Sequence, residues 1–304
     1  MKIILSPAKK MIVDIDNLAP VELPVYIDKT AEVLNWMKSK SKEELKAIWK
    51  CNDKIAEQNF NRLENMDLYN RLTPAVLAYE GIAFQYMAPS VFEIQQFEYL
   101  QNHLRILSAF YGILKPMDGV TPYRLEMQAK VGIGDAKNLY DYWGELLYRS
   151  VIDDSRIIIN LASKEYSKCI EKYLTPQDRY ITIVFCELSG DKLVTKGTYA
   201  KMARGEMVRF MAENNIENPV DIKKFDRLGY TFRGDLSSET EYVFERKAIL
   251  DNVVPPVYNC LRLSCRSSSF FQKFCIYQQV GIKYQICRNS AASGTAFAGA
   301  AASA

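Results

Sequence analysis

Apolar positions follow two different periods along the chain, and each change of period marks a new element. Residues Lys2–Leu5 form a short apolar run, and residues 156–161 repeat it. Such runs are typical of strands that are buried on both faces. Residues 180–187 and 192–198 flank a short polar turn, which predicts a β-hairpin. Further strands are expected at residues 105–111 and 242–246.

Stretches with helical periodicity alternate with these strands. They cover residues 26–37, 93–103, 139–151 and 199–214. Ser41 followed by Glu44 forms a capping box that opens a helix running toward Lys50, and Asn52 begins a second helix that ends near Leu63. The alternation without any internal repeat predicts an α/β (mixed α+β) fold, with a single compact domain whose mixed sheet is covered by helices.

The periodic pattern stops near Ile249. Beyond it the charged content falls, and serine, cysteine and alanine become frequent. We therefore predict one domain over residues 1–249 and an atypical, disordered extension over residues 250–304. The alternative is an accessory segment that binds a metal through its cysteines, although their spacings match no zinc template. These cysteines are Cys260, Cys265, Cys275 and Cys287.

The charge divides at the same place. The whole chain carries a net charge of +3, but five cations and one acid follow Ile249, so the first 249 residues have a net charge of −1. Nucleic-acid binding by this part would therefore need a local cationic patch. The N-terminal apolar run is too short for a signal peptide, and no run is long enough to cross a membrane. We expect a cytoplasmic protein that does not bind membranes.

The residue inventory excludes several kinds of site. His103 is the only histidine in the sequence, so a multi-histidine metal site is impossible. Leu100 stands where a ferritin-type site needs a carboxylate, which argues against direct iron storage. Cys51, Cys169 and Cys186 are isolated from one another, as is typical of small buried side chains. We expect no metal and no cofactor, and we expect His103 to pack or to cap a helix end.

Five segments form a set with a fixed order and spacing. They are LSPAK at residues 5–9, HLRILSAFYGILKPMD at 103–118, PYRLEM at 122–127, NLASKEY at 160–166 and YAKMARG at 199–205. Together they resemble the YaaA family of bacterial peroxide-stress proteins, from residue 1 to about residue 246. The resemblance implies a cytosolic protein that limits free intracellular iron, and so limits radical damage to DNA and protein. It implies no defined reaction, and whether the protein is an enzyme stays open.

The resemblance also implies a positively charged cleft, and DNA binding through a helix-hairpin-helix-like element that maps onto residues 41–63. Four lysines recur there at every fourth residue and form one cationic stripe on a helix and its continuation. They are Lys42, Lys46, Lys50 and Lys54. The turn at residues 51–53 lacks the Gly-x-Gly that brings backbone amides against a phosphate. The alternative is a solvated helix face that neighbouring glutamates balance.

Six further cations lie in the five segments. They are Lys9, Arg105, Lys115, Arg124, Lys201 and Arg204. We expect them to converge on an anionic small molecule in a cleft, with Glu126 as a candidate acid or base. The alternative is that they form structural ion pairs. An enzyme or small-molecule binder is thus the second functional hypothesis, beside a DNA-binding stress protein.

Overall fold

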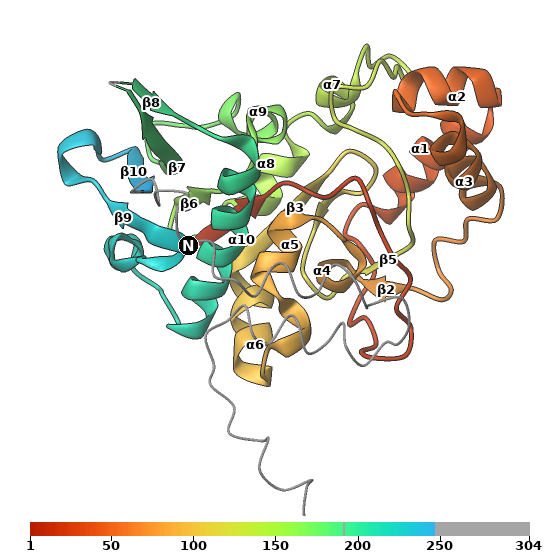
Figure 1. The fold of residues 1–304 in the computed structure, drawn as a ribbon. Coiled ribbons are helices and arrows are strands. Elements are labelled where there is room, and N and C mark those ends of the chain that lie inside the picture. The colour runs from red at the N-terminus through yellow and green to blue at the C-terminus, as the bar shows by residue number, and fades with distance from the viewer. Residues whose placement is uncertain (191, 247–304) are drawn as a thin grey trace, which may run out of the picture. The chain divides into compact units, whose positions relative to one another are not determined.

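The structure is a computed structural model that describes residues 1–190 and 192–246 (Figure 1). The extension expected over residues 250–304, with its four cysteines, lies outside the described residues. Within them the fold is a mixed α/β single domain in which helices flank a mixed sheet, as the sequence predicts. None of the helices in this part has the length and apolar character needed to cross a lipid bilayer.

The main sheet has a parallel centre with antiparallel additions. Its strands are β1 (Lys2–Leu5), β3 (Leu104–Ser108), β4 (Gly112–Leu114), β6 (Ile157–Asn160), β7 (Arg179–Ser189), β8 (Lys192–Val194), β9 (Tyr230–Phe232) and β10 (Glu241–Arg246). Among the described residues the order is β4-β3-β1-β6-β7-β10-β9, and β8 pairs with β7. The strands β3, β1, β6, β7 and β10 pair in parallel with one another, and β4, β8 and β9 are the antiparallel additions. A small second sheet joins β2 (Thr73–Pro74) to β5 (Gly119–Val120).

Helices connect these strands and pack against them. The α-helices are α1 (Ile27–Lys38), α2 (Lys42–Trp49), α3 (Asp53–Glu64), α4 (Ala75–Ala78), α5 (Ile82–Met87), α6 (Ile94–His103), α7 (Leu139–Trp143), α8 (Leu146–Val151), α9 (Lys164–Glu171) and α10 (Gly197–Glu213). Short 3₁₀ helices cover η1 (Pro89–Val91), η2 (Pro219–Lys224), η3 (Arg227–Gly229) and η4 (Gly234–Leu236). Figure 1 shows α1, α2 and α3 grouped together, well away from β8, β9 and β10.

The predicted elements are present, with differences in extent and number. The strand predicted over residues 105–111 ends at Ser108, and the strand predicted over residues 192–198 ends at Val194, because α10 begins at Gly197. The capping box is confirmed, because Ser41 Oγ accepts from the Glu44 amide at 3.2 Å and the Glu44 carboxylate accepts from the Ser41 amide at 2.8 Å. The single helix expected over residues 139–151 is instead two helices, because Gly144 takes a positive φ of 50° that ends α7. Residues 112–127, for which the sequence pattern predicts no strand, contain the short strands β4 and β5.

The helix α10 packs unusually closely on α5. A Cβ placed on Gly205 would lie 1.8 Å from the carbonyl oxygen of Ala83, which is far inside van der Waals contact. The two backbones therefore touch at this point, and only glycine allows it. Ala203 and Met207 on either side of Gly205 are fully buried. This contact fixes the side chains of the first half of α10 relative to α5.

One carboxylate of the core is only partly satisfied. Asp118 is 2% exposed, and its Oδ2 accepts from the Lys115 amide at 2.8 Å, while its Oδ1 is buried without a hydrogen-bond partner in the described part of the chain. Burial raises the pKa of Asp118 to about 7, and Glu22 adds to the shift. In the folded state the carboxyl of Asp118 is therefore mainly protonated at pH values below about 7.

We predict that Gly205→Ala lowers the free energy of unfolding by about 3 kcal/mol or more, because the new methyl group forces the backbones of α5 and α10 apart. Gly197→Ala, at the first residue of the same helix, is the matched control, since a Cβ there meets nothing within 4 Å. It should leave stability unchanged or slightly raised. Urea unfolding of both variants measures the difference. Equal stability of the two variants would contradict the close contact.

We predict that Asp118 makes the protein less stable as the pH rises. Its pKa in the folded state, about 7, exceeds that of an ordinary unfolded aspartate, so its contribution is complete below about pH 4 and is lost by about pH 7. Asp118→Asn should remove this dependence, while the exposed Asp154→Asn should keep it. Urea unfolding at pH 5 and pH 7.5 tests this, and parallel behaviour of the wild type and Asp118→Asn would refute it.

Candidate functional site

A pocket opens at the carboxyl ends of β1 and β6, the two neighbouring parallel strands in the middle of the sheet. Within the sheet, β1 lies between β3 and β6. The strands that follow β1 in the sequence are first added on its β3 side, and the later strands, beginning with β6, are added on its opposite side. Ligands of open α/β sheets bind at such a point, where the strand order reverses. The pocket has a volume of about 380 Å³, which lies in the range of small-molecule sites, about 300 to 1,000 Å³.

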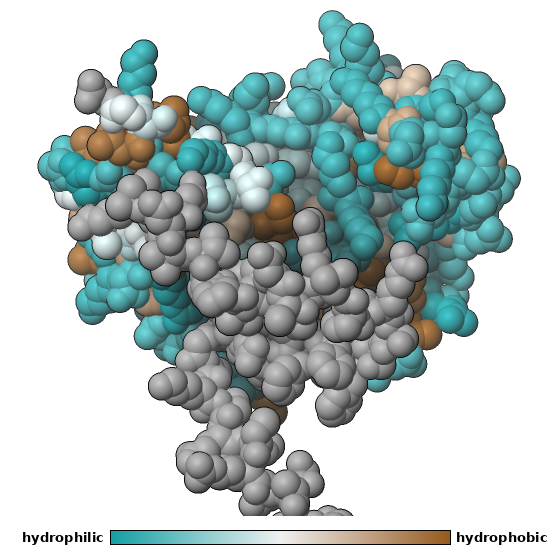
Figure 2. Space-filling view, viewed as in Figure 1, coloured by the Kyte–Doolittle hydropathy of each residue, from teal (hydrophilic) through white to brown (hydrophobic). Residues whose placement is uncertain are grey.

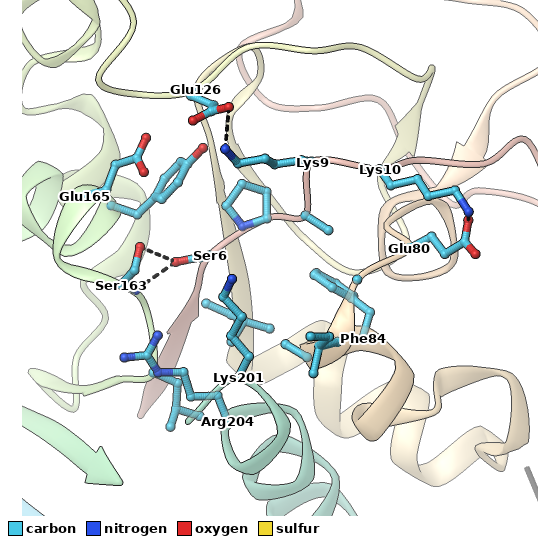
Figure 3. A pocket seen from close by; sticks show the side chains of 18 of the residues that line it. Ser6, Lys9, Lys10, Glu80, Phe84, Glu126, Ser163, Glu165, Lys201 and Arg204 are labelled. Carbon is cyan, nitrogen blue, oxygen red and sulfur yellow. Dashed lines mark hydrogen bonds and ion pairs between the residues drawn. The ribbon is translucent and has the colours of Figure 1, made fainter. Parts of the chain in front are cut away.

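Five parts of the chain form the walls of the pocket. Residues 5–10 follow β1, residues 161–166 join β6 to α9, residues 123–126 form a loop, and α5 and α10 close the remaining sides. Figure 3 shows Lys201 and Arg204 extending from α10 toward Ser6 and Ser163. The contact between Gly205 and Ala83 sets this arrangement, because Ala83 also lines the pocket.

Three of the pocket cations pair with carboxylates of the same pocket. Lys9 Nζ lies 2.8 Å from Glu126 (Figure 3). The Arg124 guanidinium lies 3.7 Å from the same carboxylate. Lys10 Nζ lies 2.8 Å from Glu80. The side chains of Lys9 and Lys10 are mostly exposed, so the two lysine pairs contribute little to stability, about 0 to 1 kcal/mol each. They cancel charge at the rim of the pocket.

The two cations of α10 differ from these three. Neither Lys201 nor Arg204 has an ion pair with any described residue, and the Nε of Arg204 is buried without a hydrogen-bond acceptor. Burial lowers the pKa of the Arg204 guanidinium, and no neighbouring carboxylate offsets this. A partly buried guanidinium without a partner is unfavourable in the empty pocket. The α10 wall is therefore the electropositive side of the site.

Hydroxyl groups lie between the α10 wall and the start of α9. The Ser163 amide donates to Ser6 Oγ at 2.8 Å, and Ser6 Oγ donates to Ser163 Oγ at 3.1 Å (Figure 3). Ser163 is the N-cap residue of α9, but its side chain makes no capping hydrogen bond. Glu165, in the first turn of α9, accepts from the Gln128 amide at 3.3 Å. The arrangement can hold an oxyanion between cations and hydroxyl donors.

The six cations expected to converge are divided between two places. Lys9, Arg124, Lys201 and Arg204 line the pocket. Arg105 lies elsewhere and donates to the carbonyl oxygens of Gln101 and Leu104 at 3.0 and 2.7 Å, while Lys115 pairs with Glu22 at 2.7 Å. Arg105 is at the amino end of β3, and antiparallel β4 returns Lys115 to that same end. The pocket lies at the opposite, carboxyl end of the parallel strands.

Glu126, the candidate acid or base, is held between two cations. Lys9 and Arg124 both contact its carboxylate, which is 21% exposed. Arg124 also donates to the carbonyl oxygen of Trp49, the last residue of α2, at 3.4 Å. In the structure Glu126 therefore positions two cations at the pocket rim, and Arg124 links the pocket to the α2–α3 pair. A role in proton transfer stays a prediction.

The four lysines expected to bind DNA lie on two helices and the turn between them. Lys50 takes a left-handed conformation that ends α2, so Lys54 belongs to α3 and does not continue the α2 helix. Lys42 pairs with Glu57, and Lys46 pairs with Asp53. Lys50 and Lys54 are exposed and have no ion pair with a described residue. Hydrophilic residues dominate the surface where α2 and α3 lie (Figure 2).

His103, Cys169 and Cys186 do not line the pocket, and their contacts are those of residues that support the fold. His103 ends α6, stacks on Tyr99 at 4.3 Å, and its Nδ1 lies 2.8 Å from the carbonyl oxygen of Met1. Cys169 and Cys186 are buried, and burial raises the pKa of the Cys169 thiol to about 12. In the described part of the chain, no group of three or more histidine, cysteine or acidic side chains is arranged to hold a metal ion.

Sequence reasoning missed several pocket residues. Ser6, Tyr123, Ser163, Glu165 and Tyr166 line the pocket, but none was selected as a site residue. A usable signal was present, because Ser6 directly follows β1 and Ser163 lies three residues after the end of β6. The ends of neighbouring parallel strands meet at one edge of a sheet. Tyr123 carries no such signal, since only the packing of its loop brings it there.

Comparison with known proteins identifies the family. A family model described as peroxide stress protein YaaA matches residues 1–236. The chain is 90% identical over 247 residues to a UPF0246 protein of Agathobacter rectalis, which covers 81% of this chain and 99% of the relative. A UPF0246 protein of Lachnoclostridium phytofermentans is 57% identical over 244 residues, which cover 80% of this chain and 96% of that protein. A UPF0246 protein of Pediococcus pentosaceus is 50% identical over 244 residues, which cover 80% of this chain and 97% of that protein. The chain therefore belongs to the peroxide stress protein YaaA family.

Proposed function

We propose that the protein binds an anionic ligand in the pocket at the ends of β1 and β6, and that this binding serves its role in peroxide stress. The observation that carries the proposal is Arg204. It lines the pocket, its Nε is buried, and it has no acidic partner among the described residues. An anion in the pocket would supply the missing partner.

The neighbouring charges support the same proposal. Three carboxylates line the pocket, Glu80, Glu126 and Glu165, and together they match the charge of the three rim cations Lys9, Lys10 and Arg124. An incoming anion therefore meets net positive charge mainly at Lys201 and Arg204. A guanidinium presents a planar fork of donors that suits the oxygens of a phosphate or carboxylate group. Binding there would convert an unfavourable buried charge into a charge-assisted hydrogen bond.

The wider role follows from the family. We propose that the protein acts in the cytoplasm to protect DNA and protein from peroxide by lowering free iron. The described residues offer no cluster of metal ligands, so we propose an indirect route to iron that runs through the pocket ligand. Glu126, the candidate acid or base for any conversion of the ligand, is engaged by two cations.

DNA binding by the α2–α3 pair is the second candidate function. Two observations favour it: Lys50 and Lys54 are exposed without acidic partners in the described part of the chain, and Arg124 joins the pocket to the end of α2. Phosphates of a duplex could then contact the turn between α2 and α3. Lys42 and Lys46 are less suited to this, since Glu57 and Asp53 already neutralise them.

We predict that Arg204→Met weakens the binding of inorganic pyrophosphate, the probe anion, at least tenfold, because the main cationic contact is lost. Stability should be unchanged or higher, since methionine fills the space without a buried charge. Arg149→Met is the control, because Arg149 is exposed and pairs with Glu145 within α8. Isothermal titration calorimetry and urea unfolding measure both quantities, and survival of cells in hydrogen peroxide should follow the binding.

The opposite result has a distinct signature. If Arg204 served a structural ion pair, its removal would cost about 3 to 5 kcal/mol of stability. An Arg204→Met variant that is destabilised but binds pyrophosphate as tightly as the wild type would therefore refute the proposal. Equal losses of binding in the Arg204 and Arg149 variants would also count against it, since they would indicate an effect of net charge alone.

We predict that Lys50 and Lys54 carry the salt dependence of DNA binding. The double variant Lys50→Ala/Lys54→Ala should flatten the log–log slope of duplex affinity against salt by about 1.8, because two phosphate contacts are lost. The matched control Lys42→Ala/Lys46→Ala should change the slope less, since acidic partners already neutralise these lysines. Titration of a labelled duplex at several salt concentrations measures the slopes. If neither double variant changes it, duplex binding belongs to another surface.

A further inference from the structure

A buried serine beneath the pocket has a fixed hydrogen-bond direction. Ser108 Oγ accepts from the amides of Phe110 and Tyr111 at 3.2 and 2.9 Å. A hydroxyl has two acceptor positions and one proton, so these amides occupy both acceptor positions. The Ser108 proton must therefore point to its remaining neighbour, the hydroxyl of Tyr123 at 2.7 Å.

This direction leaves one tyrosine proton without an acceptor. The hydroxyls of Tyr123 and Tyr79 lie 2.9 Å apart and share one hydrogen bond, so only one of their two protons is used between them. No described residue accepts the other proton, and Ser108 Oγ has no acceptor position left. Burial raises the pKa of Tyr79 well above its usual value and that of Tyr123 to about 12, so both phenols keep their protons at neutral pH.

The spare proton belongs at Tyr123, because Tyr123 lines the pocket next to Arg124, while Tyr79 is not among the lining residues. Tyr123 can accept from both Ser108 and Tyr79 and can donate its own proton into the pocket. A buried donor needs an acceptor, because leaving it unpaired destabilises the folded state. An acceptor atom of a ligand in the pocket can supply it.

Ser163 presents a second spare donor to the same pocket. Its Oγ accepts from Ser6 Oγ, and Ser6 Oγ accepts in turn from the Ser163 amide, so the Ser163 proton is not used within this pair. The usual task of a serine at an N-cap is to accept from the first turn of the helix, and Ser163 does not do so. Its hydroxyl is thus available to a ligand.

We infer that Tyr123 and Ser163 donate hydrogen bonds to a tetrahedral oxyanion, a phosphate group, held against Arg204 and Lys201. This inference rests on the proposed function and names its ligand class. The donors come from three walls: the loop at residues 123–126, the start of α9, and α10. A tetrahedral group directs oxygens to three sides at once, whereas a carboxylate presents its two oxygens in one plane.

The test compares hydroxyl variants in the full chain, with inorganic pyrophosphate as the probe. Tyr123→Phe and Ser163→Ala should each weaken binding about tenfold or more, because each removes one hydrogen bond to a charged group. Tyr79→Phe is the matched control, since it removes a neighbouring phenol while Ser108 still donates to Tyr123. It should bind within about twofold of the wild type. Wild-type protein should also prefer pyrophosphate to malonate, a planar-ended dianion, by at least tenfold.

Each other outcome overturns a defined part of the inference. Wild-type affinity in Tyr123→Phe and Ser163→Ala, with binding lost in Arg204→Met, would refute the hydroxyl donors and leave the proposed function standing. Equal affinity for malonate and pyrophosphate would refute the tetrahedral ligand. No binding of pyrophosphate by the wild type would refute the proposed function together with this inference.

A second measurement covers the case in which Tyr123→Phe does not fold. Saturating the wild type and Tyr79→Phe with pyrophosphate should shift the near-ultraviolet tyrosine absorption equally in both, because Tyr123 gains an anionic acceptor. The absence of a shift in both proteins, with binding demonstrated by calorimetry, would overturn the role of Tyr123.

Discussion

The contact between Gly205 and Ala83 is the constraint on which the pocket depends. The backbones of α10 and α5 touch there, so no side chain separates the two helices. Interiors of proteins are packed to the density of crystals, and a contact between backbones cannot adjust as two flexible side chains can. Arg204 immediately precedes Gly205, and Lys201 lies one turn earlier on α10. The contact thereby holds both cations over the carboxyl ends of β1 and β6.

The charges of the site separate into a balanced rim and an unbalanced wall. Lys9, Lys10 and Arg124 have acidic partners in the pocket, whereas Lys201 and Arg204 have none among the described residues. An arginine that is partly buried without a partner lowers the stability of the folded chain. Proteins retain such groups where binding requires them, as they do other strained or unsatisfied features. The unpaired Arg204 is therefore better explained by a ligand than by the stability of the fold.

The sequence predicted the elements well and the site only in part. The apolar runs at Lys2–Leu5 and residues 156–161 gave β1 and β6 because parallel strands buried in a domain need apolar side chains on both faces. The break at Gly144 was missed, since helical periodicity continues through it and the positive φ depends on local packing. Arg105 and Lys115 were grouped with the pocket cations because they lie in the same kind of segment. Strand direction takes them to the opposite end of the sheet.

The sequence by itself determined what is local in this protein: the strands and helices, the capping box at Ser41, the family, and the set from which the pocket cations are drawn. These depend on the order of residues within one turn or one strand, where spacing alone fixes which side chains are neighbours. The tertiary structure decided which cations meet, which are neutralised, and which hydroxyl protons remain free. The bonds of Tyr123 to Ser108 and Tyr79 span 15 and 44 residues. Such partners become neighbours only when the chain folds, so no local pattern records them.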